Sequence, residues 1–360
     1  MQYVHGGDYH KNKGMLDFSA NINPLGMPKG CMKEAMRGVL ESVHYPDYEG
    51  RKLLHALTQS EGVDSHAIIL GNGAAELIYA ICYAIFPQKA LVAVPCFQEY
   101  EIALHNVGCQ VEHYCLKREM EYQLDEDFLL AITKEIDLVF LCNPNNPTGK
   151  LIEKELLTQI VTRCQECNTY LVIDECFLPF VIEEENYSMK AALENNPYLF
   201  ILRAFTKIYA MPGLRLGYFI SLNETMRTKI RSCMQPWNTS IPAQYAGLKA
   251  LKDQEFIART RAFIEKERTY LEKRLRLPVI DHVFKGQANF IFFEASKDLY
   301  RHLQDKQIII RDCSNFENLS KGFYRIAILM HKENETLIRA IEEATEYGYE
   351  KELLNNGGKE

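Results

Sequence analysis

The sequence predicts an α/β protein with a large, mostly parallel sheet of seven strands layered by helices, and a smaller α+β domain. Short apolar runs alternate with helical patterns between residues 65 and 222, the order that builds sheets with helices on their faces. Several of these runs are continuously aliphatic or β-branched, as is typical of strands buried on both faces. After Pro242 the pattern changes to a long charged helix followed by more widely spaced strands.

Each strand of the large sheet is predicted from one short apolar run. The seven runs are residues 68–70, 91–95, 111–116, 138–142, 170–174, 199–202 and 216–220. Helical segments such as 76–85 and 153–165 lie between them. Strands that alternate with helices in this way favour parallel pairing.

The C-terminal third predicts the smaller domain. A charged helical pattern at 254–276 has the character of a connector. Beyond it, strands are expected at 279–284, 289–294, 308–311 and 324–328, and helices at 297–305 and 333–346.

The length of 360 residues is about twice that of a typical domain, which favours two domains. We expect an arm at 1–40 that contributes to the small domain and the active site. Residues 41–240 would form the large domain, and 241–360 the connecting helix and the small domain. Ligands commonly bind in the cleft between two such domains.

The charge of the chain excludes polyanionic partners. With 41 basic and 48 acidic residues the net charge is -7, so neither nucleic acid nor an anionic membrane is expected as a partner. The longest apolar stretch, 77–86, is shorter than the roughly 20 residues of a membrane span. The first 14 residues lack the pattern of a signal peptide, so we expect a cytoplasmic protein.

The eleven cysteines predict reduced thiols rather than disulfides, because their number is odd and they are scattered through apolar segments. Cys164 and Cys167 form a Cys-x-x-Cys pair. With no second pair or histidine pair at zinc spacing, no metal site is expected.

Two polar loops follow predicted strands. Residues 71–76 read Gly-Asn-Gly-Ala-Ala-Glu before a helix, where backbone N–H groups could bind a phosphate or the glycines could simply start the helix. Residues 143–149 read Asn-Pro-Asn-Asn-Pro-Thr-Gly, a rigid loop with more fixed side-chain amides than a turn requires.

Three charged residues, like the two loops, stand at or near the ends of predicted strands. Asp174 ends a buried strand, where it could be either an ordinary helix cap or a functional carboxylate. Lys207 lies between an apolar strand and a Pro-Gly turn, so it could be a surface residue or an amine for Schiff-base chemistry. Arg215 follows eight residues later and has the planar fork that suits a phosphate.

Taken together and in this order, the two loops, Asp174, and the segment from Lys207 to Arg215 resemble the corresponding motifs of the pyridoxal-phosphate enzymes of the aspartate-aminotransferase fold type I. The resemblance implies that Lys207 binds the cofactor as a Schiff base and moves protons, and that Asp174 pairs with the pyridinium nitrogen. Asn146 would bond the phenolic oxygen, and Phe97 would stack on the ring. The groups implied for the cofactor phosphate are Gly73, Ala74, Ala75, Thr206 and Arg215.

A narrower resemblance covers residues 5 to about 346. The segments 5–7 (His-Gly-Gly), 16–26, 45–47 (Tyr-Pro-Asp), 310–313 and 324–327 are similar to the threonine-phosphate decarboxylases of cobalamin biosynthesis. This resemblance implies that the substrate's phosphate and carboxylate are bound by His5, Asn21, Asn146, Arg311 and Arg325. Tyr45 would reach the neighbouring subunit's site, which implies a homodimer.

The reaction is open between two relatives at this point. Phe177 stands where histidinol-phosphate aminotransferases commonly carry a tyrosine, which favours decarboxylation. Ala204 replaces a frequent hydroxyl for the cofactor phosphate, and Leu329 replaces a second arginine. Serine phosphate therefore stays open beside threonine phosphate, because one methyl group is worth only about 1–3 kcal/mol in a pocket.

A remote alternative is a non-catalytic regulator that binds the cofactor. The acidic charge and the lack of room for a DNA-binding segment in 360 residues argue against it.

Overall fold

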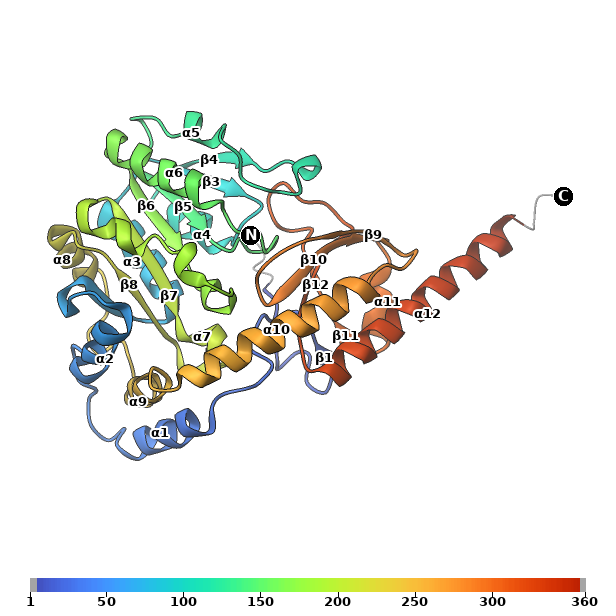
Figure 1. Cartoon of the computed structure of the whole chain (residues 1–360), viewed down its shortest axis with the longest axis horizontal. Helices are drawn as coiled ribbons and strands as arrows, with labels where there is room; N and C mark the ends of the chain where they lie inside the picture. The colour runs from blue at the N-terminus through green and yellow to red at the C-terminus, as the bar shows by residue number, and fades with distance from the viewer. Residues whose placement is uncertain (1–4, 357–360) are drawn as a thin grey trace.

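The large sheet has seven strands, as the sequence predicts (Figure 1). The computed structural model describes residues 5–356. In spatial order the strands are β2 (Ile68–Asn72), β8 (Leu216–Ile220), β7 (Leu199–Ala204), β6 (Tyr170–Asp174), β5 (Leu138–Cys142), β3 (Lys89–Val94) and β4 (Gln110–Cys115). All pairs are parallel except those of β8, which runs antiparallel to both neighbours. The predicted α/β class is therefore confirmed.

Burial on both faces explains the continuous apolar sequences of the central strands. In β5, Leu138 and Phe140 pack in one core, whereas Val139 and Leu141 pack in the core on the opposite face. The first core includes side chains of α3 (Gly73–Ile85), α4 (Glu99–Asn106) and α8 (Glu224–Ser232). The second includes side chains of α2 (Arg51–Glu61), α6 (Lys154–Cys167) and α9 (Ile241–Ala250).

A second, antiparallel sheet is formed by strands that follow the long helix α10 (Gln254–Arg274) in the sequence, and it lies beside the C-terminal part of that helix (Figure 1). Its order is β12 (Arg311–Asp312), β13 (Phe323–Ala327), β10 (Phe290–Ala295) and β9 (Ile280–Phe284). The accompanying helices are α11 (Leu299–Asp305) and α12 (His331–Asn356). None of the helices between residues 5 and 356 combines the length and the hydropathy needed to cross a membrane.

The N-terminal segment pairs with this C-terminal part of the chain. Strand β1 (Leu16–Asp17) lies parallel to β11 (Ile308–Ile309), and α1 (Lys29–Leu40) packs on α9. The predicted strand 308–311 is wrong as one unit, because the chain leaves β11 at Ile310 and enters a different sheet as β12.

The remaining α-helices are α5 (Phe128–Ala131) and α7 (Phe205–Ile208). The domain boundaries at residues 40 and 240 stay a prediction.

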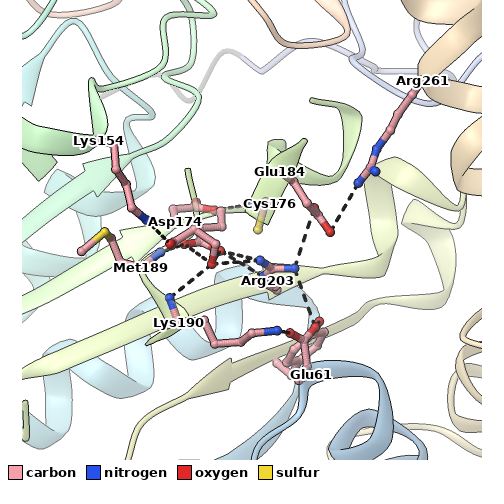
Figure 2. A network of polar contacts seen from close by, with 12 residues as sticks. Glu61, Lys154, Asp174, Cys176, Glu184, Met189, Lys190, Arg203 and Arg261 are labelled. Atoms are coloured by element: carbon pink, nitrogen blue, oxygen red, sulfur yellow. Dashed lines mark hydrogen bonds and ion pairs between the residues drawn. The ribbon is translucent and has the colours of Figure 1, made fainter. Parts of the chain in front are cut away.

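A buried ion network ties the ends of β6 and β7 to the helices around them (Figure 2). Arg203 Nη2 lies 2.6 Å from Glu175 Oε2, and both side chains are almost fully buried. Arg203 Nη1 also faces Glu61 on α2, at 3.7 Å. Arg261 of α10 joins through Glu184, with 3.3 Å between Nη2 and Oε1. The network thereby joins the end of β6, which carries Asp174, to the end of β7, which leads into the helix of Lys207.

We predict that Arg203→Met lowers the free energy of unfolding by about 3–5 kcal/mol, because it leaves the Glu175 carboxylate buried without its guanidinium. The double variant Glu175→Gln, Arg203→Met removes both charges and should recover at least half of this loss. Urea denaturation of the three proteins measures both values. Equal stability of the two variants would contradict the assignment of the loss to an unpaired charge.

Candidate active site

A cavity of about 410 Å³ opens where β5, β6 and β7 end, between the large sheet and the second sheet. This is the position at which open α/β sheets bind ligands. It brings together twelve of the residues that the sequence predicted, namely His5, Asn21, Ala74, Ala75, Phe97, Asn146, Asp174, Thr206, Lys207, Arg215, Arg311 and Arg325.

Lys207 lies on the short helix α7, directly after β7. Its position is fixed by Asn23, whose backbone N–H donates to the Lys207 carbonyl and whose side chain donates to the carbonyl of Ile208. Burial and the neighbouring guanidinium groups of Arg325 and Arg215 lower the pKa of Lys207 to about 8. A lysine with the ordinary pKa of about 10.4 would be almost wholly protonated near neutral pH, whereas here a much larger fraction of the amine is neutral and can act as a nucleophile.

Asp174 forms the base of the cavity and is 5% exposed. Tyr100 donates its hydroxyl to Oδ2 at 2.7 Å, and the backbone N–H of Cys176 donates to Oδ1 at 2.9 Å. Burial raises the pKa of Asp174, although these two hydrogen bonds and the charge of Lys207 act in the opposite direction. A buried carboxylate of this kind can pair with a cationic ring nitrogen.

The start of α3 and Arg215 lie together at the lining of the cavity. Arg215 has a left-handed backbone (φ 56°), and a Cβ added at Gly73 would lie 2.5 Å from its Nη2. Glycine is therefore required where the guanidinium crosses the helix start. Glu76 accepts a hydrogen bond from the N–H of Asn72, the residue before the helix, at 2.6 Å. Within residues 5–356 the Asn72 side chain makes no capping hydrogen bond to the first turn, so the N–H groups of Ala74 and Ala75 can bind an anion beside the buried Thr206.

In the asparagine-rich loop at residues 143–149, two side-chain amides bond to the backbone and a third lines the cavity. The side-chain oxygen of Asn143 accepts from the Ile152 N–H at 2.9 Å, and the Asn145 amide donates to the Pro95 carbonyl at 3.0 Å. Asn146 instead lines the cavity, where its oxygen accepts a hydrogen bond from Arg325 Nη1.

Two arginines face each other across the second sheet. Arg311 and Arg325 are register partners in β12 and β13, and both line the cavity. Like charges directly opposite one another destabilise a sheet, which favours an anionic ligand between them. Burial, together with the charge of Arg311, lowers the pKa of Arg325 to about 10. The Nε of Arg325 and the side-chain oxygen of Asn21 are buried without a hydrogen-bond partner in the described part of the chain.

Comparison with known proteins decides the family. The family model "Aminotransferase class I and II" matches residues 13–341. The chain belongs to the aminotransferase class I and II family. It is a pyridoxal-phosphate-dependent enzyme, and the described residues fit that cofactor: an amine at Lys207, a buried acid at Asp174 and a phosphate site at Arg215 and α3.

Three relatives place the chain within the family. It is 37% identical to a threonine-phosphate decarboxylase of Salmonella typhimurium, over 91% of this chain and 90% of that protein. It is 33% identical to an adenosylcobalamin biosynthesis bifunctional protein of Leptospira interrogans, over 91% of this chain and 38% of that protein. A crystal structure of the histidinol-phosphate aminotransferase from Clostridium acetobutylicum superposes with a TM-score of 0.87 at 33% identity, over 92% of this chain and all of that one.

The aspartate-aminotransferase-like fold is also shown by a structural neighbour. A Thermus thermophilus aspartate aminotransferase, crystallised with maleate, matches with a TM-score of 0.81 and covers 91% of each chain.

Two predicted residues of this aminotransferase-family protein lie outside the cavity lining. Gly73 lies against the guanidinium of Arg215, and its lack of a side chain leaves the space that this guanidinium occupies. Tyr45 is 77% exposed and stacks on Trp237, with 4.5 Å between ring centroids. Its predicted role in a neighbouring site stays a prediction.

The two departures from the family pattern have different surroundings. Ala204 lines the cavity and adds no hydroxyl there. Leu329 packs against the hydrophobic core and is not among the cavity-lining residues, so an arginine at this position would have to turn away from that core to serve the site. Cys164 and Cys167 are buried on α6, and burial raises the pKa of the Cys164 thiol.

Several cavity residues were missed from the sequence, notably Gln98, Glu99, Tyr100 and Phe316. Tyr100 is the informative case. The helix α4 was not predicted, and without it nothing distinguished this tyrosine from nineteen others. A helix beginning just after Phe97 would have placed both aromatic residues on one face.

We predict that covalent attachment of pyridoxal phosphate to the apoprotein accelerates with pH up to about 8 and then levels off. Only the neutral amine attacks a carbonyl, and below the lowered pKa of Lys207, about 8, its neutral fraction falls about tenfold per pH unit. The rate of absorbance change after mixing, measured from pH 6.5 to 9.5, tests this. A rate that keeps rising toward about 10.4, the ordinary lysine pKa, would contradict a buried, cation-flanked amine.

Proposed function

We propose that the enzyme decarboxylates an O-phosphorylated amino acid, L-threonine O-3-phosphate or L-serine O-phosphate, to an amino-alcohol phosphate used in cobamide biosynthesis. The observation that carries this proposal is the opposed pair Arg311 and Arg325, beside His5 in the same cavity. Such a substrate has two anionic groups, a carboxylate and a phosphate, and the cavity offers cations for both. The relatives named for threonine phosphate and for adenosylcobalamin support the same class.

Pyridoxal phosphate supplies an electron sink that stabilises negative charge at the α-carbon of an amino acid. The protein decides which bond at that carbon breaks, because the guanidinium groups of Arg311 and Arg325 would bind the carboxylate and the phosphate and so orient the substrate. When the carboxylate leaves as carbon dioxide, a proton must replace it at the α-carbon. The Lys207 ammonium, with its pKa lowered to about 8, is the group placed to donate that proton.

Phe177 further supports decarboxylation. It lines the cavity and packs edge-on against Phe290, with 5.2 Å between centroids. A phenyl ring there donates no hydrogen bond, so the cavity lacks the hydroxyl that the aminotransferase pattern leads one to expect.

Histidinol-phosphate aminotransferase is the second candidate, favoured by the TM-score of 0.87 and 33% identity to that enzyme. Its substrate shares the phosphate but lacks the carboxylate.

Incubation of the holoenzyme with threonine phosphate, serine phosphate and histidinol phosphate, each with and without 2-oxoglutarate, tests the two reactions. We expect a product lighter by one carbon dioxide, formed without 2-oxoglutarate, from one or both of the phospho amino acids. Glutamate formed in step with histidinol phosphate consumption, and no loss of carbon dioxide, would overturn the proposal.

We further propose a homodimer whose sites are completed by Tyr45 of a second copy. Besides the exposed Tyr45, apolar side chains of α1 and the following turn are 51–85% exposed, namely Met32, Met36, Val39, Leu40 and Val43. Burial of such a face against a second copy would stabilise the dimer. Light scattering should give twice the chain mass of 41.6 kDa, and a monomer at micromolar concentration would refute this arrangement.

A cytoplasmic location is proposed as well. All eleven cysteines are free, and nine of them are buried, which suits a reducing compartment.

A further inference from the structure

We propose that Glu99 is a positioning residue, which holds the imidazole of His5 in place to bind the substrate's phosphate. The inference deepens the proposed function and rests on it for the identity of the phosphate compound. Glu99 begins α4 and lines the cavity, and its Oε1 lies 2.9 Å from Nε2 of His5. Its other oxygen accepts a hydrogen bond from Tyr79 at 2.8 Å.

Both oxygens of the carboxylate are thus used, and Glu99 is only 14% exposed. The hydrogen bond with His5, followed by that with Tyr79, lowers the pKa of Glu99 despite its partial burial. The carboxylate is therefore ionised at neutral pH. Beside it, the side-chain amide of Asn315 donates to the side-chain oxygen of Gln98 at 3.0 Å, and the Gln98 amide donates to the Asn315 carbonyl, which anchors the start of α4 to the loop after β12.

The arm that carries His5 is fixed as well. The N–H of Gly7 donates to the hydroxyl of Ser19 at 2.8 Å. A Cβ added at Gly6 would lie 2.3 Å from the Ser19 carbonyl oxygen, so only glycine permits this approach. These backbone contacts place His5 at the edge of the cavity, and the contact with Glu99 then fixes the orientation of the His5 imidazole ring.

An acidic residue is unexpected in a cavity whose cations favour an anion. As an isolated charge, Glu99 would repel the phosphate. Bonded to Nε2, however, it accepts the proton of that nitrogen and fixes the plane of the ring, so that Nδ1 is the ring nitrogen left to contact the ligand. The two roles predict opposite effects when the charge is removed, and this makes the proposal testable.

The test is the binding of inorganic phosphate to the holoenzyme, measured by calorimetry and by competitive inhibition. We expect Glu99→Gln to raise the phosphate Kd and the KM of the phosphorylated substrate about tenfold. The kcat and the cofactor absorbance should change less than about twofold. Tighter or unchanged phosphate binding would overturn the proposal, because Glu99 would then be only a repelling charge or the polar start of a helix.

A double-mutant cycle with His5→Ala isolates the coupling. In the His5→Ala background, Glu99→Gln should no longer weaken phosphate binding. Equal weakening in both backgrounds would overturn the assignment to His5. Tyr79→Phe, which frees one carboxylate oxygen, provides a second variant, and we expect it to raise the phosphate Kd about threefold.

The same helix offers a matched control. Glu101 Oε1 lies 2.5 Å from Nε2 of His113, outside the cavity lining, so Glu101→Gln removes an equivalent glutamate–histidine contact and should leave phosphate binding unchanged. Phosphate binding does not depend on which reaction follows. If the enzyme proved to transaminate histidinol phosphate, the proposed function would be refuted. The role of Glu99 would still be decided separately, by the phosphate Kd of the Glu99→Gln variant.

Discussion

Lys207→Ala is expected to abolish covalent attachment of the cofactor and to lower kcat at least about a thousandfold. Within residues 5–356 no hydrogen bond or ion pair of the Lys207 amine is found, and its pKa is lowered to about 8 by burial and neighbouring arginines. It is thus the amine in the cavity that can both bond to a carbonyl and move a proton. Borohydride reduction followed by peptide mass mapping should locate the cofactor on residue 207 in the wild type and on no peptide in the variant.

Lys154→Ala is the control for this experiment. Lys154 is also a partly buried lysine whose pKa is lowered by desolvation, but its amine donates to the Ser188 carbonyl and lies outside the cavity lining. This variant should keep the cofactor attached. A yellow, borohydride-fixed Lys207→Ala protein would show that another amine serves the cofactor.

Asp174→Asn is expected to lower kcat by about 10²–10³ while the cofactor stays attached to Lys207. The amide preserves the shape of the side chain but removes the negative charge that would keep the pyridinium nitrogen protonated. Steady-state kinetics together with borohydride fixation separate the loss of catalysis from the loss of cofactor.

Tyr100→Phe is the matched control for Asp174, because it removes one hydrogen bond to the carboxylate and no charge. We expect a much smaller loss of kcat, on the order of tenfold or less. If Asp174→Asn were no more impaired than Tyr100→Phe, the charge of Asp174 would have no special part in catalysis.

The strands of the large sheet could be predicted because burial on both faces leaves a local mark, as in Leu138 to Cys142. The antiparallel direction of β8 could not, since an apolar run such as Leu216 to Ile220 reads the same in either direction. The sequence also did not show that the predicted strand 308–311 divides at Ile310 into β11 and β12. One apolar run there serves two sheets, and only the partner strands reveal where it divides.

The residues proposed for the cofactor could be predicted to lie together because they stand in short segments of unusual composition, and all of them except Gly73 line one cavity. Contacts between distant segments left no such mark. Arg325 meets Asn146 across 179 residues, and Glu99 lies at the start of a helix, where an acidic residue is ordinary. Tyr45 is exposed and lies outside the cavity lining of its own chain, which agrees with the expectation that it serves a neighbouring site but does not test it.

The pairing of β1 with β11 has a consequence for the order in which the protein is made. Every residue proposed to hold the cofactor lies between 73 and 215, whereas the residues proposed for the substrate, apart from Asn146, come from the two ends of the chain. Domains generally begin to fold as they leave the ribosome, N-terminal part first. A nascent chain that has emerged to residue 250 therefore already carries every residue proposed for the cofactor. The arm with His5 finds its partner strand only after Ile309 has been added, so cofactor capture can precede the ability to bind substrate.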